Sequence, residues 1–372
     1  MKQISKIGIT KKVIKKTTFG KDHFRGISVY AGIDVHKNSW YVTIYVGKIL
    51  FKSFSMSPPS SEQLIGYLNE HFPGGEYHVV YEAGFSGYSL YDDLTEAGID
   101  CKVVSPADVP MGNKSKKFKT DRNDSKNLAQ QLMSESLSGI HIPDPIIREY
   151  RALLRLRNKL VRDRTRIKNY TKSNLMFFGK EIKDEEGKSK KSWSKEYYRL
   201  LSEVNYATDE GNNVMERQIN MIKYLDGQVK EVDKEIEALS NNPRFKEDVD
   251  ILTSVPGIAI LSAMVLLVEI GDFNRFSDTH QLKSYVGLIP NEHSSGEKEV
   301  KTEITRRGNK FIKKIIIEAS WTAIGKDKSL LKIYTKAIKR MTGTRAIILV
   351  ASSLINRIRS IMRQRTHYKL AV

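Results

Sequence analysis

The sequence predicts an α/β domain near the N-terminus, followed by a largely helical remainder. Three short runs rich in β-branched and aromatic residues follow one another between residues 28 and 56. Helix and strand patterns then alternate up to about residue 104, and beyond about residue 127 the apolar spacing is helical almost throughout. A chain of 372 residues has room for two or three such domains.

The first part of the chain predicts a mixed sheet. The runs "SVYAGIDVHK", "SWYVTIYV" and "KILFKSFSM", with a Gly47-Lys48 turn before the last, read as an antiparallel meander. After "SPPSS" come a helix in "EQLIGYLNEHF", a buried strand in "EYHVVYEAG", a helix in "GYSLYDDLTEAG" and a strand in "IDCKVVSP". This order is that of an RNase-H-like fold. We expect that domain over residues 28–140, after a basic arm at 1–27.

Residues 141–249 predict a helical coiled-coil region. Residues 148–172 carry ten Lys/Arg against two acids, with Leu153, Leu156, Leu160 and Ile167 as the apolar seam. A heptad pattern follows in a second long helix, which indicates that the two helices pack together, internally or in self-association. The polar stretch 180–213 between them predicts a loop or mobile insertion. The heptad positions are Met215, Ile219, Ile222, Leu225, Val229, Val232, Ile236 and Leu239.

Residues 250–372 predict a mostly α-helical C-terminal domain. The Pro-Gly turn in "ILTSVPGIAILSAMVLLVEIG" is typical of a helix-hairpin-helix, whose turn amides can meet a DNA phosphate, or of an ordinary helical hairpin. "DFNRFSDTHQLKSYVGLIPNEHSSGEKEV" predicts a turn-rich loop, and "KTEITRRGNKFIKKIIIEASW" a basic segment leading into an apolar helix.

The composition indicates a polyanionic partner. There are 62 Lys and Arg against 43 Asp and Glu, a net charge of +19, and nucleic acid is the commonest partner for such a field, with an anionic membrane surface as the rival. No apolar run approaches the roughly 18 to 20 residues of a membrane span, and the N-terminus lacks a signal-type apolar core. One cysteine, Cys101, excludes an intramolecular disulfide. We therefore expect a cytoplasmic protein.

Four carboxylates stand where this fold would gather them. Asp34 lies in the first strand and Glu82 ends the fourth, which adjoins the first in such a sheet. Asp121 and Asp124 are three residues apart, so they share one face of a helix. Such a cluster suits Mg²⁺, which takes oxygen ligands. The alternative is a simple helix start, with Asp121 as N-cap and Asp124 in the first turn.

The motifs around these acids resemble a known family. "GIDVHK", "YEAGFSGY" and "KTDRNDS" resemble the Asp-Glu-Asp-Asp motif of the insertion-sequence transposases of the IS-one-ten family, whose N-terminal domain is similar to the resolvase RuvC. "SVPGI", "YVGLIPNEHSSGEK" and "EITRRGNKFIKKIIIEASW" resemble that family's C-terminal domain, so the resemblance runs from about residue 29 to 325. It implies Asp34, Glu82, Asp121 and Asp124 as catalytic acids that bind two Mg²⁺ ions, or Mn²⁺ in their place.

The resemblance also implies a serine nucleophile and an RNA partner. Ser295 matches the nucleophile's position best and Ser294 lies one residue away, whereas the residues themselves read as a solvent loop. The family pattern implies a composite site across subunits of a dimer or tetramer. It further implies a structured bridge RNA that pairs with donor and target DNA, in a prokaryotic enzyme associated with the nucleoid.

The expected function is therefore a DNA transposase or recombinase. Two alternatives remain: a metal-dependent nuclease of the Holliday-junction-resolvase type that uses water as nucleophile, and a non-catalytic RNA- or DNA-binding protein. The basic residues expected to hold nucleic acid are Lys114, Lys116, Lys117, Lys119, Arg122, Arg151, Arg155, Arg162, Arg166, Arg306, Arg307, Lys310, Lys313 and Lys314.

Overall fold

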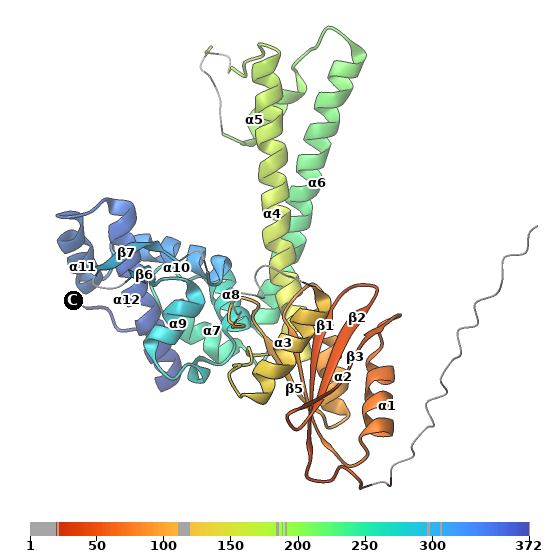
Figure 1. The fold of residues 1–372 in the computed structure, drawn as a ribbon. Coiled ribbons are helices and arrows are strands. Elements are labelled where there is room, and N and C mark those ends of the chain that lie inside the picture. Colours follow the sequence, from red (N-terminus) through yellow and green to blue (C-terminus); the bar gives the residue numbers. More distant parts are fainter. Residues whose placement is uncertain are drawn as a thin grey trace, which may run out of the picture. The chain divides into compact units, whose positions relative to one another are not determined.

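The structure, a computed structural model, describes residue 20 and residues 22–110, 120–183, 186–187, 189, 192–295, 298–305 and 307–371, with the backbone alone from 291 to 304. The chain forms two compact units, Met1–Ile142 and Pro143–Val372, and each is described by itself (Figure 1). The predicted domain boundary at 249 falls within the second unit and stays a prediction. Most of the predicted basic arm lies outside the described residues.

The first unit is built on a mixed five-stranded sheet. Its strands are β1 (Ser28–Val35), β2 (Trp40–Val46), β3 (Ile49–Met56), β4 (Glu76–Glu82) and β5 (Asp100–Val104). They lie in the order β3-β2-β1-β4-β5, with β1, β2 and β3 antiparallel and β1, β4 and β5 parallel. This arrangement confirms the predicted strand order and fits an RNase-H-like α/β fold.

Helices cover the two faces of this sheet. Val29, Ala31 and Ile33 of β1 share a hydrophobic core with α1 (Ser61–His71) and α2 (Ser89–Glu96). Tyr30, by contrast, packs into a second core with Leu128 of α3 (Asp121–Met133). Because side chains alternate along a strand, Gly32 and Asp34 share the α3 side with Tyr30. The fold thus directs Asp34 toward the helix that carries Asp121.

The second unit is mainly helical, and its elements are listed in chain order. They are α4 (Pro145–Phe177), α5 (Lys195–Ser202), α6 (Asp209–Ser240), α7 (Lys246–Thr253), α8 (Ile260–Ile270), the 3₁₀ turn η1 (Phe273–Arg275), α9 (Thr279–Val286), β6 (Pro290–Ser295), β7 (Lys298–Ile304), α10 (Lys310–Ala323), α11 (Lys328–Ile338) and α12 (Gly343–Gln364). In the described part of the chain, no helix is both long and apolar enough to cross a membrane.

Helices α4 and α6 run side by side, as Figure 1 shows. Six of the eight predicted heptad positions of α6 are buried, and Leu225 and Leu239 are half-buried. In α4 the predicted seam is wrong at one position, because Leu156 is 47% exposed whereas Leu154 is fully buried. The aliphatic parts of neighbouring arginine side chains also cover apolar surface, so the apolar stripe of such a basic helix is difficult to recognise in the sequence. The pairing of these helices in a coiled coil stays a prediction.

Two segments expected to be loops contain regular structure. In 180–213, α5 places Tyr197 and Leu201 in a small core with Leu175 and Ile219. In 272–300, the chain forms η1, α9 and the strand β6, which pairs antiparallel with β7. Both segments are rich in polar residues, so the apolar anchors that fold them are few and far apart in the sequence. The Pro-Gly turn lies between α7 and α8, and its contact with DNA stays a prediction.

Candidate active site

Gly32 in β1 lets helix α3 lie directly on the sheet. A Cβ atom at this position would fall 2.1 Å from the Ser125 carbonyl oxygen and 2.4 Å from the Ala129 backbone nitrogen. The Ser125 hydroxyl also forms a buried 2.8 Å hydrogen bond with the Thr43 hydroxyl of β2. These contacts hold the N-terminal half of α3 against the sheet, directly after the first turn, which carries Asp121 and Asp124.

The residue that caps α3 is Thr120, not Asp121. The Asn123 amide donates to the Thr120 hydroxyl at 3.2 Å, which is the usual N-cap bond. The alternative interpretation of Asp121 as the N-cap is therefore wrong. Asp121 and Asp124 both lie in the first turn, with carboxylates that the cap leaves available.

Asp34, His36 and Asp121 converge at the end of β1. The His36 Nε2 atom lies 3.2 Å from the Asp34 Oδ2 atom and 3.5 Å from the Asp121 Oδ1 atom. One donor atom from each of the three residues lies within 4.8 Å of the others. The sequence interpretation missed His36, although it stands two residues after Asp34 in the same motif. This group is the candidate metal site.

The remaining two acids lie nearby but outside this set of donors. The parallel register ends with the pair Ile33–Tyr81, so Asp34 and Glu82 follow at neighbouring positions on adjacent strands. Alternation along β4 places Glu82 on the same face as Val80, which packs in the core with α3. Asp124 is close enough that its charge acts on Asp34. A ligand role for Glu82 and Asp124 stays a prediction.

The electrostatics of the cluster favour a cation. Partial burial raises the pKa of Asp34, and the charges of Asp121 and Asp124 raise it further, whereas His36 lowers it. The net rise means that ionised Asp34 is disfavoured in its surroundings. A divalent ion would reverse this balance. Carboxylate oxygens, which supply two of the three donor atoms, suit Mg²⁺ and Mn²⁺.

The serine candidates lie at the end of strand β6. In the β6–β7 pairing, Ser294 is opposite Glu299 and Ser295 is opposite Lys298. The expectation of a plain solvent loop is therefore wrong for the backbone, which forms a hairpin. Whether either serine is a nucleophile stays a prediction.

The base of this hairpin is held closed by two glycines. A Cβ atom on Gly308 would lie 2.6 Å from the Gly287 nitrogen. The backbone segments that lead into and out of the hairpin can therefore lie this close together only because both residues are glycines. Both glycines have positive φ, which favours glycine. Backbone bonds from Thr305 to Ile289 at 3.0 Å and from Asn309 to Tyr285 at 2.8 Å close the same base.

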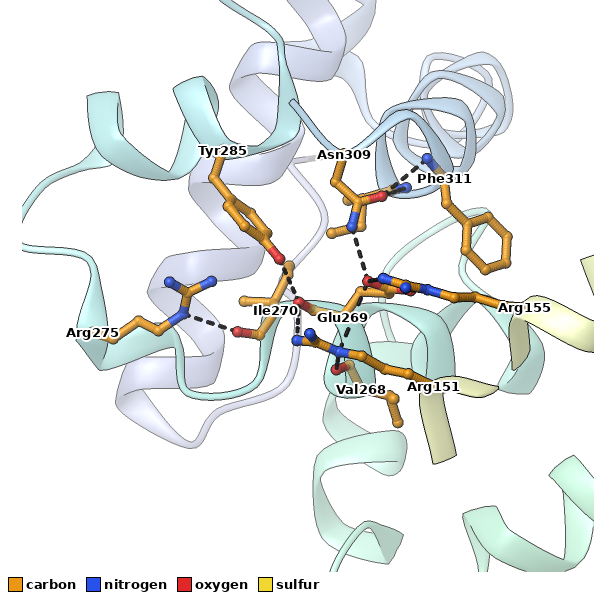
Figure 2. Close-up of polar contacts among 10 residues, drawn as sticks. Arg151, Arg155, Val268, Glu269, Ile270, Arg275, Tyr285, Asn309 and Phe311 are labelled. Carbon is orange, nitrogen blue, oxygen red and sulfur yellow. Dashed lines mark hydrogen bonds and ion pairs between the residues drawn. The ribbon is translucent and has the colours of Figure 1, made fainter. Parts of the chain in front are cut away.

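The buried residue Glu269 joins four helices through its side chain and its backbone carbonyl (Figure 2). Glu269 of α8 is 1% exposed. Arg155 of α4 donates to both its carboxylate oxygens at 2.8 and 2.9 Å, and Asn309, the N-cap of α10, donates at 3.0 Å. Tyr285 of α9 donates to the Glu269 carbonyl at 2.7 Å. Since Tyr285 and Asn309 also close the hairpin base, this network fixes the base relative to α4.

Three of the predicted nucleic-acid contacts use their donors within the protein. Arg151, 13% exposed, donates to the carbonyls of Val268 and Glu269 (Figure 2). Arg155 holds Glu269, and Lys313 is half-buried, with Nζ 3.4 Å from the Thr305 carbonyl. A phosphate contact for Arg151, Arg155 and Lys313 stays a prediction. The bonds to Glu269 give Arg155 a packing role that its position in a basic run did not reveal.

The other predicted contacts are exposed where the structure describes them. The exposed residues are Arg122, Arg162, Arg166, Arg307, Lys310 and Lys314. Lys114, Lys116, Lys117, Lys119 and Arg306 lie outside the described residues.

Comparison with known proteins places the chain in a family. The model of the Transposase IS116/IS110/IS902 family matches residues 249–335, and a transposase model of the IS110 DEDD type matches residues 31–178. The chain belongs to the IS110 family of transposases. It is therefore an enzyme that acts on DNA. The first match contains the serine hairpin and Glu269, and the second contains the acidic cluster. DEDD transposases typically use divalent metal ions, which agrees with the donors found here.

Individual relatives agree with this assignment. The chain is 28% identical over 243 residues to the transposase for insertion sequence element IS1111A of Coxiella burnetii, covering 65% of this chain and 64% of that protein. It is 27% identical over 312 residues to the transposase for insertion sequence element IS1533 of Leptospira borgpetersenii, covering 79% and 84% of the two chains. The match thus spans less than two thirds of the Coxiella protein.

Proposed function

We propose that this IS110-family transposase is a recombinase that cuts and religates DNA at the ends and target of a mobile element, guided by a structured bridge RNA. The observation that carries the proposal is the convergence of Asp34, His36 and Asp121, with donor atoms within 4.8 Å of one another. The net charge of +19 supports binding to both nucleic acids. The enzyme would act as a dimer or tetramer on DNA in the nucleoid.

In this proposal the acidic side chains bind the metal ion, and the packing of α3 on β1 keeps these side chains in position. Asp34 and Asp121 would bind the ion, with Glu82 and Asp124 completing a site for two Mg²⁺ or Mn²⁺ ions. When bound, the metal supplies Lewis-acid stabilisation of the charge that develops on the phosphate oxygens. Gly32 and Ser125 keep α3 against β1, so the two acids of α3 stay in register with Asp34.

The proposed covalent step uses the Ser295 hydroxyl. Its oxygen loses a proton and bonds to the phosphorus of a DNA phosphodiester, while the bond from phosphorus to the leaving strand oxygen breaks and that oxygen takes up a proton. The product is a phosphoserine ester that keeps the energy of the broken bond. A hydroxyl of the incoming strand then attacks the ester, which restores the serine and joins the DNA without an added energy source.

Removing one carboxylate tests the metal site. Asp121→Ala should abolish strand cleavage and weaken Mn²⁺ binding, with folding and nucleic-acid binding intact. Glu96→Ala, an exposed acid of α2, is the matched control and should cleave normally. Cleavage by Asp121→Ala at the wild-type rate, or by the wild type in EDTA, would contradict the proposed site.

Trapping the covalent intermediate tests the serine. Ser295→Ala should remove the protein–DNA adduct and recombination but leave binding unchanged, because a lost hydroxyl barely alters a phosphate-dominated interface. Ser294→Ala is the control for the one-residue ambiguity, and loss of the adduct in that variant alone would move the nucleophile by one position. If the double variant still cuts DNA, water is the nucleophile and the resolvase-type reaction takes the place of the serine mechanism.

A further inference from the structure

A basic groove lies between α4 and α10. Its volume is about 300 Å³. One face of α4 lines the groove with three residues at spacings of four and three positions, Asn158, Arg162 and Thr165. Helix α10 lines it with two lysines one turn apart, Lys310 and Lys314. The side chains of successive turns thus point into one channel from both sides.

The positive charge of this groove is not neutralised within the protein. In the part of the chain that the structure describes, neither Arg162 nor Lys310 has an ion-pair partner, and no carboxylate lines the groove. Lys314 has a loose contact at 3.7 Å with Glu318, on its own helix. Like charges that face one another across a groove repel, and an anion that enters the groove replaces this repulsion with attraction.

The contrast with other arginines of α4 shows that this is a local feature. Arg157 donates to Asp233 of α6 at 2.8 Å, and Arg164 donates to Asp226 at 2.8 Å. Together with Arg155 on Glu269, these arginines hold α4 to its neighbours. Arg162 lies between them in the sequence but faces α10, where no acid among the described side chains meets it.

The Glu269 network sets the width of the groove. Arg155 lies two turns before Arg162 on α4, and Asn309 immediately precedes Lys310 on α10. Because Glu269 binds both Arg155 and Asn309 (Figure 2), it fixes the spacing of the two helices next to the groove. The backbone positions that carry the cations are therefore fixed before any ligand arrives, which lowers part of the entropy cost of binding.

We propose that this groove binds the sugar–phosphate backbone of a nucleic acid strand that the transposase engages. The inference rests on the proposed function. Arginine can donate two bonds to one phosphate, and lysine supplies a point charge to its neighbours along the strand. Backbone contacts carry no sequence information and position the strand. This suits an enzyme whose sequence recognition is delegated to base pairing with a guide RNA.

A charge-matched pair of triple variants tests the groove. The test variant carries Arg162→Gln, Lys310→Gln and Lys314→Gln. The control carries Lys332→Gln and Lys336→Gln on exposed positions of α11 and Lys339→Gln at its exposed C-cap. Binding to a DNA duplex and to an RNA hairpin is measured by fluorescence anisotropy against salt, in the Ser294→Ala, Ser295→Ala background. Thermal unfolding of each variant checks that the fold is retained.

For three lost phosphate contacts, the slope of log K against log salt for the DNA duplex should become shallower by about 2.7. The control should keep the wild-type slope. A reduced slope with RNA alone, or with DNA alone, identifies which strand occupies the groove. Equal effects in both triple variants would mean that the groove cations contribute no more than other surface cations, which would overturn the proposal. An unchanged slope in the test variant would overturn it as well. If the test variant keeps the wild-type slope while the enzyme with intact serines still forms the covalent adduct, the groove inference fails and the proposed function stands.

Discussion

Replacing Gly32 with alanine should disrupt the candidate active site by pushing away the helix that carries two of its acids. The added methyl group would start 2.1 Å from the Ser125 carbonyl oxygen and 2.4 Å from the Ala129 nitrogen. Both are backbone atoms of α3, so no side-chain rotation can relieve the overlap. The helix must move away from β1, and Asp121 and Asp124 move with it.

The size of the effect follows from these distances. Real Cβ atoms essentially never approach a heavy atom within 3.0 Å, so α3 must retreat by about 1 Å. Overpacking of this kind costs about 1–3 kcal/mol, and the rigid backbone places the expected loss near the upper end. A misplacement of about 1 Å can slow a reaction by roughly 10²-fold, and we expect a decrease of that order in strand cleavage.

The assay combines urea denaturation, Mn²⁺ titration and single-turnover cleavage. Gly66→Ala is the matched control in the same unit, because Gly66 lies in α1 with no atom within 4 Å of the added carbon. It should stabilise the unit by about 0.5–1 kcal/mol and leave cleavage unchanged. A Gly32→Ala protein with wild-type stability and cleavage would refute the reasoning, since it would mean that α3 does not rest on β1 as described.

Three further predictions concern charge. Burial and then the neighbouring acids raise the pKa of Asp34, so ionisation of this carboxyl group destabilises the folded protein as pH rises. Asp34→Asn should therefore raise the Tm of the protein in EDTA but weaken Mn²⁺ binding about tenfold or more. A lower Tm would contradict this. Arg155→Met removes the arginine that pairs with the buried Glu269 carboxylate and should lower the free energy of unfolding by about 2–3 kcal/mol, a modest loss for a buried pair because the Arg155 side chain is 60% exposed and its charge is screened. In a double-mutant cycle measured by urea denaturation, adding Glu269→Met should recover most of that loss. Burial raises the pKa of Asp327, but hydrogen bonds from Ser329, Tyr368 and the Leu330 amide, with the charge of Arg357, outweigh burial and hold the pKa well below its usual range. The stability that ionised Asp327 contributes is present above about pH 4 and is lost as pH falls. Asp327→Asn should therefore lower the Tm at pH 7 and flatten the decline of the Tm below pH 4.

The sequence alone was sufficient for the features that depend on local periodicity. Alternation of apolar residues and the turn at Gly47 predicted the β1–β2–β3 meander, and the heptad spacing predicted which side of α6 is buried. The two acids of "TDRND" were placed on one helix face because three residues make nearly one turn. Each of these inferences uses neighbours in the chain, whose relative directions the backbone geometry determines.

Only the tertiary structure decided which side chains meet. Arg155 and Arg162 look alike in the sequence, yet the first reaches Glu269, 114 positions away, and the second faces a groove that no described carboxylate lines. His36 joined the acidic cluster, and Thr120 rather than Asp121 became the cap of α3. Periodicity says which way a side chain points from its own element but nothing about what the facing element presents. An ion pair, a metal site or a groove is a property of two such surfaces together, so it exists only once the chain has folded.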